Sequence, residues 1–379
     1  MRVGLDYLPG TTHFPGVGRY ARELVRALVQ VPDAPSLKLL EWGGERPAIG
    51  EPHLGLVGAL QRPTRRRIPL PRRAADALFR FTGAGVDRWL GGVDLFHRIF
   101  PHWPPVSRAV QLQPVGELPP LDSREGELLR AQLAGLDHFL VFSEHARVAL
   151  TDGFGFGSAR VHRVPIGSDQ WRRELAELPP RSDPPVILVL GATRAIRRHG
   201  TILRAFEELR RTHPGARLRL LGAEGDATRE FEAQLAASPA RDAVEWRREP
   251  DEAAMPGEMA HASLLVHLTE HEESAVTPLE ALSFGTPVLA TRLPAFEEAL
   301  GDAADLVDND GAVADPAEFA RSMARGLETA GDRAACEARE ELARRHTWAV
   351  NARATVEVWG AVIGTVPRQM TTDSITRSD

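Results

Sequence analysis

Short apolar runs alternate with amphipathic stretches along most of the chain, and this alternation constrains the fold more than any other feature. Runs rich in Val, Leu and Ile are typical of strands buried on both faces, and the stretches between them are typical of covering helices. The first set of predicted strands comprises residues 3–7, 37–41, 94–97, 109–112, 138–142 and 161–164. We therefore predict an α/β fold built on parallel sheets.

A proline-rich polar segment interrupts this alternation. Residues 178–185 read LPPRSDPP, and proline continues neither a helix nor a central strand. The alternation then restarts, with predicted strands at 186–190, 217–221, 244–246, 264–267, 287–291 and 305–307. A length of 379 residues also exceeds what one hydrophobic core usually serves. The sequence predicts two doubly wound domains, residues 1–178 and 186–346, joined by a linker at 179–185.

The C-terminal region predicts one more helix. Val350, Ala354, Val358 and Val362 lie four residues apart, which places them on one helical stripe. We predict a helix over residues 347–364 and a disordered tail over 365–379, because the residues from Thr365 onward are polar and lack a period.

Composition excludes several classes of function. The net charge of −6 and the pI near 6.1 give no global electrostatic reason to bind nucleic acid. The single cysteine, Cys336, excludes an internal disulfide and a cysteine-based zinc cluster. No apolar run approaches the roughly 18–20 residues of a membrane helix, and Met1 leads directly into a predicted strand without a signal-like segment. We therefore expect a cytoplasmic protein.

A local basic cluster departs from the acidic average. Arg62 to Arg73 read RPTRRRIPLPRR, and this segment has two interpretations. One is a solvated loop followed by a helix start. The other is peripheral contact with an anionic membrane surface.

The most informative segment for chemistry is HLTEHEESAVTPLEALSFGTPV, residues 267–288. It leads from a strand end through an acidic loop into a helix predicted to begin at Thr277-Pro278. A helix start after a strand of a doubly wound sheet offers backbone N–H groups to a phosphate, here over Val276 to Leu279. Glu280 has a second interpretation, because Thr277 and Glu280 also form a capping box that needs no ligand.

A glycine-rich loop near the N-terminus also has two interpretations. Gly16, Gly18 and Ala21 fit the dinucleotide fingerprint G-x-G-x-x-A, with Glu41 at a second strand end as a ribose partner. However, residues 8–15 separate this loop from its strand, whereas the fingerprint follows its strand almost directly. The alternative is that these glycines bring backbone close to the phosphates of another nucleotide.

The 267–288 segment resembles the retaining glycosyltransferases of family 4, which have the GT-B fold. Glu272 and Glu280 match the two glutamates of the family pattern, and residues 285–288 (GTPV) match its ending. The Gly-Phe-Gly between the glutamates is replaced by residues 273–275 (ESA). Six other segments agree in order and spacing: 1–28, 94–105, 141–150, 160–169, 191–206 and 348–359. The resemblance covers roughly residues 1–363.

The resemblance implies two facing Rossmann-like domains, with the C-terminal helix crossing back to the first domain. It implies a hexosyl transfer from a nucleotide-sugar donor to the hydroxyl of a glycan, lipid or small molecule, with retention at the anomeric carbon and without a cofactor or metal. Glu272, Arg197 and Arg198 are the expected catalytic residues, Glu272 on donor sugar hydroxyls and the arginines on the diphosphate. The expected donor-binding residues are Gly16, Gly18, Gln113, Arg194, Val276, Thr277, Pro278, Leu279 and Glu280, the last of these on the ribose.

A second departure concerns the first domain. Many members of the family carry His-Asp where this chain has Gln113-Pro114, and a glutamine cannot act as an acid or base near pH 7. The histidines that could substitute in part are His13, His97, His145 and His271. Two alternatives stay open: a non-catalytic GT-B homologue that binds a nucleotide-sugar or partners another transferase, and a nicotinamide-dependent enzyme that uses Gly16 to Ala21.

Overall fold

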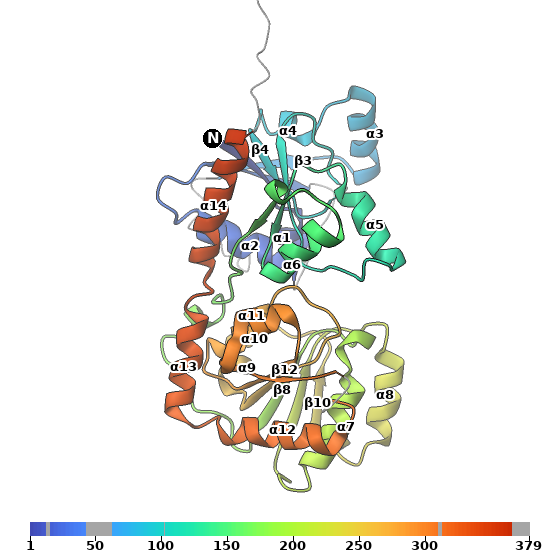
Figure 1. Ribbon diagram of the computed structural model, residues 1–379, viewed down its shortest axis with the longest axis vertical. Helices are drawn as coiled ribbons and strands as arrows, with labels where there is room; N and C mark the ends of the chain where they lie inside the picture. Colours follow the sequence, from blue (N-terminus) through green and yellow to red (C-terminus); the bar gives the residue numbers. More distant parts are fainter. Residues whose placement is uncertain (13–15, 43–62, 102, 310–312, 366–379) are drawn as a thin grey trace, which may run out of the picture. The chain divides into compact units, whose positions relative to one another are not determined.

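The computed structural model describes residues 1–12, 16–42, 63–101, 103–309 and 313–365, which form two parallel sheets with helices around them (Figure 1). The described chain packs into two compact units. Unit 1 comprises Met1–Pro114, Gln132–Phe139 and the chain from Ala352, and unit 2 comprises Val115–Ala131 and Leu140–Asn351. This division does not test the predicted domain boundaries, so the linker at 179–185 remains a prediction.

The first sheet has seven strands in the order β3-β2-β1-β4-β5-β6-β7. Its strands are β1 (Arg2–Asp6), β2 (Ser36–Trp42), β3 (Thr64–Ile68), β4 (Leu95–His97), β5 (Val110–Pro114), β6 (His138–Val141) and β7 (Val161–Arg163). The helices between them are α1 (Leu8–Thr12), α2 (Val17–Leu28), α3 (Arg72–Thr82), α4 (Val86–Trp89), α5 (Arg124–Leu133) and α6 (Glu144–Val148). Because β1 pairs in parallel with both β2 and β4, the strand order reverses between β1 and β4.

The second sheet has six strands in the order β10-β9-β8-β11-β12-β13. They are β8 (Val186–Leu190), β9 (Arg217–Leu221), β10 (Val244–Arg247), β11 (Leu264–His267), β12 (Val288–Thr291) and β13 (Asp305–Val307). Its helices are α7 (His199–Leu209), α8 (Thr228–Ala237), α9 (Met255–His261), α10 (Val276–Leu282), α11 (Pro294–Leu300), α12 (Pro316–Glu328) and α13 (Arg333–Ala343), before the terminal α14 (Trp348–Thr365). Both sheets follow the strand order 3-2-1-4-5-6 of doubly wound folds, which confirms the predicted fold class.

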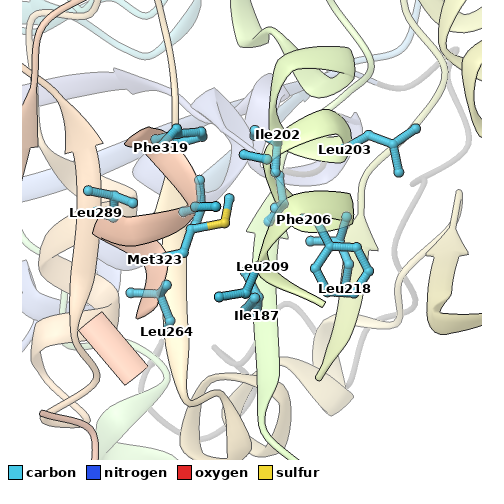
Figure 2. Packing of buried hydrophobic residues seen from close by; sticks show 14 of the residues in the cluster. Ile187, Ile202, Leu203, Phe206, Leu209, Leu218, Leu264, Leu289, Phe319 and Met323 are labelled. Carbon is cyan, nitrogen blue, oxygen red and sulfur yellow. The ribbon is translucent and has the colours of Figure 1, made fainter. Parts of the chain in front are cut away.

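Alternating side chains of the second sheet build its core. Ile187 of β8, Leu218 of β9 and Leu264 of β11 point to one face, where α7 and α12 cover them (Figure 2). Phe206 of α7 and Met323 of α12 fill the space between sheet and helices (Figure 2). Full burial of each such side chain contributes about 1.5–3 kcal/mol, so this layer keeps the strand ends in fixed positions.

Two glycines let the loops after β8 and β9 approach each other. Gly191 directly follows β8 and has a φ of +121°, a conformation that residues with a side chain rarely adopt. A Cβ added to Gly222 after β9 would lie 1.9 Å from the carbonyl oxygen of Gly191. The backbone therefore leaves the carboxyl end of β8 in a direction that a larger residue would block.

Two sequence predictions need correction. In the basic cluster the predicted helix start is observed, because α3 begins at Arg72. The predicted loop before it is wrong, because residues 64–68 form β3, an edge strand whose only buried side chain is Ile68. Arg62 lies outside the described residues. The terminal helix extends through Thr365, and the rest of the predicted tail, 366–379, also lies outside them.

Candidate functional site

The reversal of strand order in the second sheet brings two polar loops together. β8 and β11 are neighbours, with Leu264 paired to Ile187 and Leu265 to Leu188. The loops that follow these strands start at the same edge of the sheet, where doubly wound proteins bind their ligands. Arg197 comes from the first loop, and His267 and Glu272 come from the end of β11 and the second loop.

Arg197, His267 and Glu272 form a half-buried cluster. The Nη1 atom of Arg197 lies 2.9 Å from Oε2 of Glu272 and 2.7 Å from Nε2 of His267. The same His267 nitrogen lies 3.0 Å from that glutamate oxygen, and the ring packs beside Phe296. The cluster therefore joins two of the three predicted catalytic residues to a histidine.

Electrostatics keep Glu272 ionised in this cluster. Burial raises the pKa of a carboxyl group, but His267 and Arg197 outweigh burial and hold the pKa of Glu272 below its usual value. Burial lowers the pKa of His267, and the neighbouring Arg197 adds to this effect against the attraction of Glu272. The cluster therefore contains a permanent cation, a carboxylate and an imidazole that favours its neutral form near pH 7.

The third predicted catalytic residue, Arg198, lies apart from this cluster. Its φ of +48° turns the backbone into the left-handed region just before α7. Its Nη2 atom lies 3.2 Å from Oε1 of Glu270, and its Nη1 donates to the carbonyl oxygen of Asn309 at 3.1 Å. The adjacent arginines therefore have different carboxylate partners.

The loop that replaces the expected glycines needs no left-handed backbone. Among the described non-glycine residues only Asp33 and Arg198 have positive φ, so the backbone at 273–275 is compatible with ordinary side chains. Glu273 is buried, and its Oε2 lies 3.9 Å from Nε2 of His145. Burial raises the pKa of Glu273; His145 opposes this effect, and Glu272 adds to it.

The predicted helix start at Thr277 is one residue late, and the predicted capping box is wrong. Helix α10 begins at Val276 after Ala275, which offers no side-chain cap. Thr277, Pro278 and Leu279 follow within this seven-residue helix. The side chain of Glu280 does not cap the start of the helix, because one of its oxygens accepts a hydrogen bond from Gln170.

Gln170 links Glu280 to the start of α14. Its Nε2 donates to Oε1 of Glu280, and its own Oε1 accepts from Nε1 of Trp348 at 2.7 Å. Glu280 is only 1% exposed. Sequence reasoning missed this chain of contacts, because Gln170 and Trp348 lie far from Glu280 in the sequence.

The remaining predicted donor residues lie on different elements. Arg194 is exposed before a 3-10 turn at Ala195–Arg197. In unit 1, Gly16 precedes α2 with a φ of +85°, and Gly18 is buried in the first turn of that helix. Helix α1 separates these glycines from β1, which disagrees with a dinucleotide fingerprint directly after its strand.

In unit 1, the side-chain amide of Gln113 forms hydrogen bonds to the protein backbone. It is buried at the end of β5, and its Nε2 donates to the carbonyl oxygens of Ile99 and Pro114, both at 2.7 Å. Arg98, directly after the neighbouring strand β4, donates to the carbonyl oxygens of Phe100 and Pro104 and to the side-chain oxygen of Gln111. The carboxyl edge of the first sheet therefore directs its polar side chains to its own backbone.

The candidate histidines have different surroundings. His97 is fully buried between Tyr20 and Trp359, and burial lowers its pKa to about 3, so it is a neutral core residue. His145 is partly exposed beside Glu273, and His271 is half-buried in the loop after β11. His13 lies outside the described residues. Sequence reasoning missed His267, although its place at a strand end, five residues before Glu272, was a usable signal.

Two features are absent from the part of the chain that the structure describes. No cluster of three or more His, Cys, Asp or Glu side chains within those residues could hold a metal ion. No helix there is both long enough and apolar enough to cross a membrane.

Comparisons with known proteins show what this chain is similar to. Residues 172–346 match the family model described as glycosyl transferases group 1. A curated glycogen synthase from Mycobacterium tuberculosis is 26% identical over 225 residues, which are 59% of this chain and 54% of that protein. The chain thus spans about half the length of the curated relatives that it matches.

Solved structures show the fold. A sucrose-phosphate synthase from Thermosynechococcus elongatus has a TM-score of 0.70 at 16% identity, over 97% of this chain and all of that one. A structure described as "Trehalose-6-phosphate from E. coli bound with UDP-2-fluoro glucose" has a TM-score of 0.66 at 12% identity, with the same coverage. The described chain therefore has the two-sheet α/β fold of these structures, and residues 172–346 are similar to glycosyl transferases group 1.

Proposed function

We propose that this protein transfers a glycosyl group from a nucleotide-sugar to an acceptor hydroxyl, with retention at the anomeric carbon. The observation that carries the proposal is the Arg197–Glu272 pair at the reversal of strand order in the second sheet. A cation and a carboxylate at such an edge suit a ligand that carries both a diphosphate and sugar hydroxyls. The family match over 172–346 and the UDP-sugar bound to a relative of similar fold support this choice.

In this proposal, the bound donor replaces the contact between Arg197 and Glu272 with contacts to itself. The diphosphate replaces Glu272 as the acceptor for the guanidinium of Arg197, which offers a planar fork of N–H donors. Glu272, ionised and released from Arg197, then accepts hydrogen bonds from hydroxyls of the donor sugar. His267 stays beside Glu272 and limits how far the carboxylate can turn.

Positive charge at this place also stabilises the leaving group. Cleavage of the glycosidic bond leaves negative charge on the nucleoside diphosphate, and a fixed guanidinium lowers the energy of that developing charge. Arg198 adds to this effect once it releases Glu270. We therefore expect transfer to proceed without an added divalent cation.

Glu280 is the proposed partner of the nucleotide ribose. Its carboxylate lies in α10, directly after the loop that contains Glu272. Gln170 holds one of its oxygens, so the group has a defined orientation before any ligand binds. A fixed acceptor costs less side-chain entropy on binding than a mobile one.

One observation favours a second function, a non-catalytic protein that binds nucleotide-sugar. Both N–H bonds of the Gln113 amide are used by backbone carbonyls, so this position offers no proton-transfer group. The nicotinamide alternative has no comparable support, since α1 separates Gly16 from β1.

Two measurements on the full chain test these functions. Calorimetric titration with UDP, GDP, ADP, dTDP and NAD should show binding of one nucleoside diphosphate and none of NAD. Proton NMR of the first product formed from the matching nucleotide-sugar, in EDTA, should show the donor's anomeric configuration. Binding without turnover for any offered acceptor would favour the non-catalytic function. An inverted product would contradict retention, and loss of activity in EDTA would contradict the metal-free site.

A further inference from the structure

Helix α3 of unit 1 has a second apolar face that no residue in the described part of the chain covers. Its inner face contributes Ala75 and Phe79 to a core shared with β3, α4 and β4. On its outer side, Leu78 is 41% exposed and Phe81 is 91% exposed. Together with the exposed Ala74 and Ala77 they follow the spacing i, i+3, i+4, i+7, which is one helical stripe. Helix α3 lies at the margin of its unit (Figure 1).

Exposed arginines border this stripe. Arg73 and Arg80 precede Ala74 and Phe81 by one residue each, so they project along one edge of the same outer side. Neither has an ion-pair partner in the part of the chain that the structure describes. We call the surface formed by Arg73, Ala74, Ala77, Leu78, Arg80 and Phe81 the α3 face.

The charge around the α3 face is positive although the whole chain is acidic. Residues 64–90 contain seven arginines and two aspartates, whereas the chain has a net charge of −6. Both aspartates have structural partners. Asp76 accepts from Nε1 of Trp103, and the buried Asp87 accepts from the backbone N–H groups of Ser107 and Arg108. Arg66 of β3 adds to the charge, because strand alternation places it on the same side of the sheet as Ile68, which packs beneath α3.

We propose that the α3 face docks on an anionic lipid bilayer, with Phe81 and Leu78 entering the boundary between headgroups and acyl chains. Arg73 and Arg80 then contact lipid phosphates. An apolar stripe bordered by arginines is the arrangement by which a helix lies in the plane of a membrane surface. A nucleic acid would satisfy the arginines but would leave the stripe of Ala, Leu and Phe in water. The inference does not depend on the proposed transferase function.

The test uses the full chain and sedimentation with vesicles of phosphatidylcholine alone or mixed with phosphatidylglycerol. We expect binding only to the anionic vesicles, and weaker binding at high salt. Phe81→Ser should weaken binding about ten-fold or more, from the loss of about 1.5 kcal/mol or more of apolar burial. Arg73→Ser and Arg80→Ser should each weaken it about five-fold, which corresponds to about 1 kcal/mol per arginine near the surface.

Matched controls distinguish binding by the α3 face from non-specific binding by other exposed side chains. Leu128 on α5 is 58% exposed, and Arg229 on α8 is exposed without an ion-pair partner among the described residues, so Leu128→Ser and Arg229→Ser remove the same chemistry elsewhere. Both control variants should bind anionic vesicles like the original protein. Equal binding by Phe81→Ser, or no binding to anionic vesicles, would overturn the proposal. Binding to a DNA duplex as tight as to vesicles, unchanged by Phe81→Ser, would overturn it in favour of a nucleic-acid surface.

Discussion

The two sheets have the same strand order but use their carboxyl edges differently. At the edge of the second sheet, Arg197 and Glu272 pair with each other in loops and stay partly exposed. At the edge of the first sheet, Arg98 is buried and donates to the carbonyl oxygens of Phe100 and Pro104. The comparison teaches that topology brings polar residues to an edge, whereas the acceptors that they meet there, backbone carbonyls or a carboxylate of another loop, decide whether they stay available to a ligand. Four predictions test this difference, from the largest expected effect to the smallest.

Arg98→Ala should cost the most stability. Arg98 serves three acceptors and lies near the buried Asp6, so its removal leaves polar groups without a partner. We expect the free energy of unfolding to fall by about 3–5 kcal/mol in urea denaturation. The exposed Arg88 on α4 is the control, and Arg88→Ala should change the free energy of unfolding by no more than about 0.5 kcal/mol. A loss below about 1 kcal/mol for Arg98→Ala would show that this edge does not depend on its polar contacts.

The pH dependence of stability should have opposite signs at the two edges. Burial raises the pKa of Asp6 from 3.8 to about 7, so the folded state binds its proton more tightly than the unfolded state. Stability relative to Asp6→Asn should therefore fall as the pH rises from about 4 to about 7, by at most about 1.4 kcal/mol per pH unit.

Glu272 should give a pH dependence of stability of the opposite sign. Its pKa is held below the usual value, so its contribution is present above the pKa of the unfolded chain and is lost as the pH falls. Stability relative to Glu272→Gln should therefore decrease below about pH 4.5. Denaturation curves for the original chain and both variants at several pH values measure the two differences. Slopes of the same sign would contradict the contrast between the edges.

Arg197→Ala should affect ligand binding more than folding. Loss of a charge-assisted hydrogen bond costs about 1.5–3 kcal/mol, so the Kd of the preferred nucleoside diphosphate should rise about 10- to 100-fold in calorimetric titration. Arg204→Ala, an exposed change on α7, is the control and should leave the Kd unchanged. An unchanged Kd for Arg197→Ala would remove this residue from the donor site.

Arg198 should contribute less, because Glu270 already balances its charge. We expect Arg198→Ala to raise the same Kd about two- to five-fold, which corresponds to roughly 0.4–1 kcal/mol. Glu270→Ala removes the competing carboxylate and should lower the Kd slightly in the same titration. If Glu270→Ala instead weakens binding, the pair positions the loop and does not compete with the ligand.

Much of the fold could be predicted because its strands are apolar on both faces. The predicted bounds of β8, β9, β11 and β13 coincide with the observed ones. Strand β3 was missed for the opposite reason: an edge strand with four exposed side chains, three of them arginines, has almost no apolar pattern. The start of α10 differed by one residue, because Ala275 gives no capping signal in the sequence.

The candidate site could be predicted only in part. Glu272, Glu280 and Arg197 stood out through motif spacing, and their proposed roles toward a donor stay predictions. The partners of these residues could not be predicted, since Arg197 and Glu272 are 75 residues apart and Glu280 and Gln170 are 110 apart. The Arg197–Glu272 pair forms because two loops leave neighbouring strands at one edge of a sheet, whereas the Gln170–Glu280 pair joins the segment between β7 and β8 to helix α10.

The sequence by itself determined the α/β class, the two doubly wound sheets and the loops that carry charge, because apolar periodicity and proline placement act over a few residues. Tertiary structure decided which charges are paired and which are buried. Arg197 and Arg198 are adjacent in the sequence, yet the left-handed backbone at Arg198 sends one guanidinium to Glu272 and the other to Glu270. That outcome depends on distances between distant segments, which the packing of strands and helices sets and local sequence does not contain.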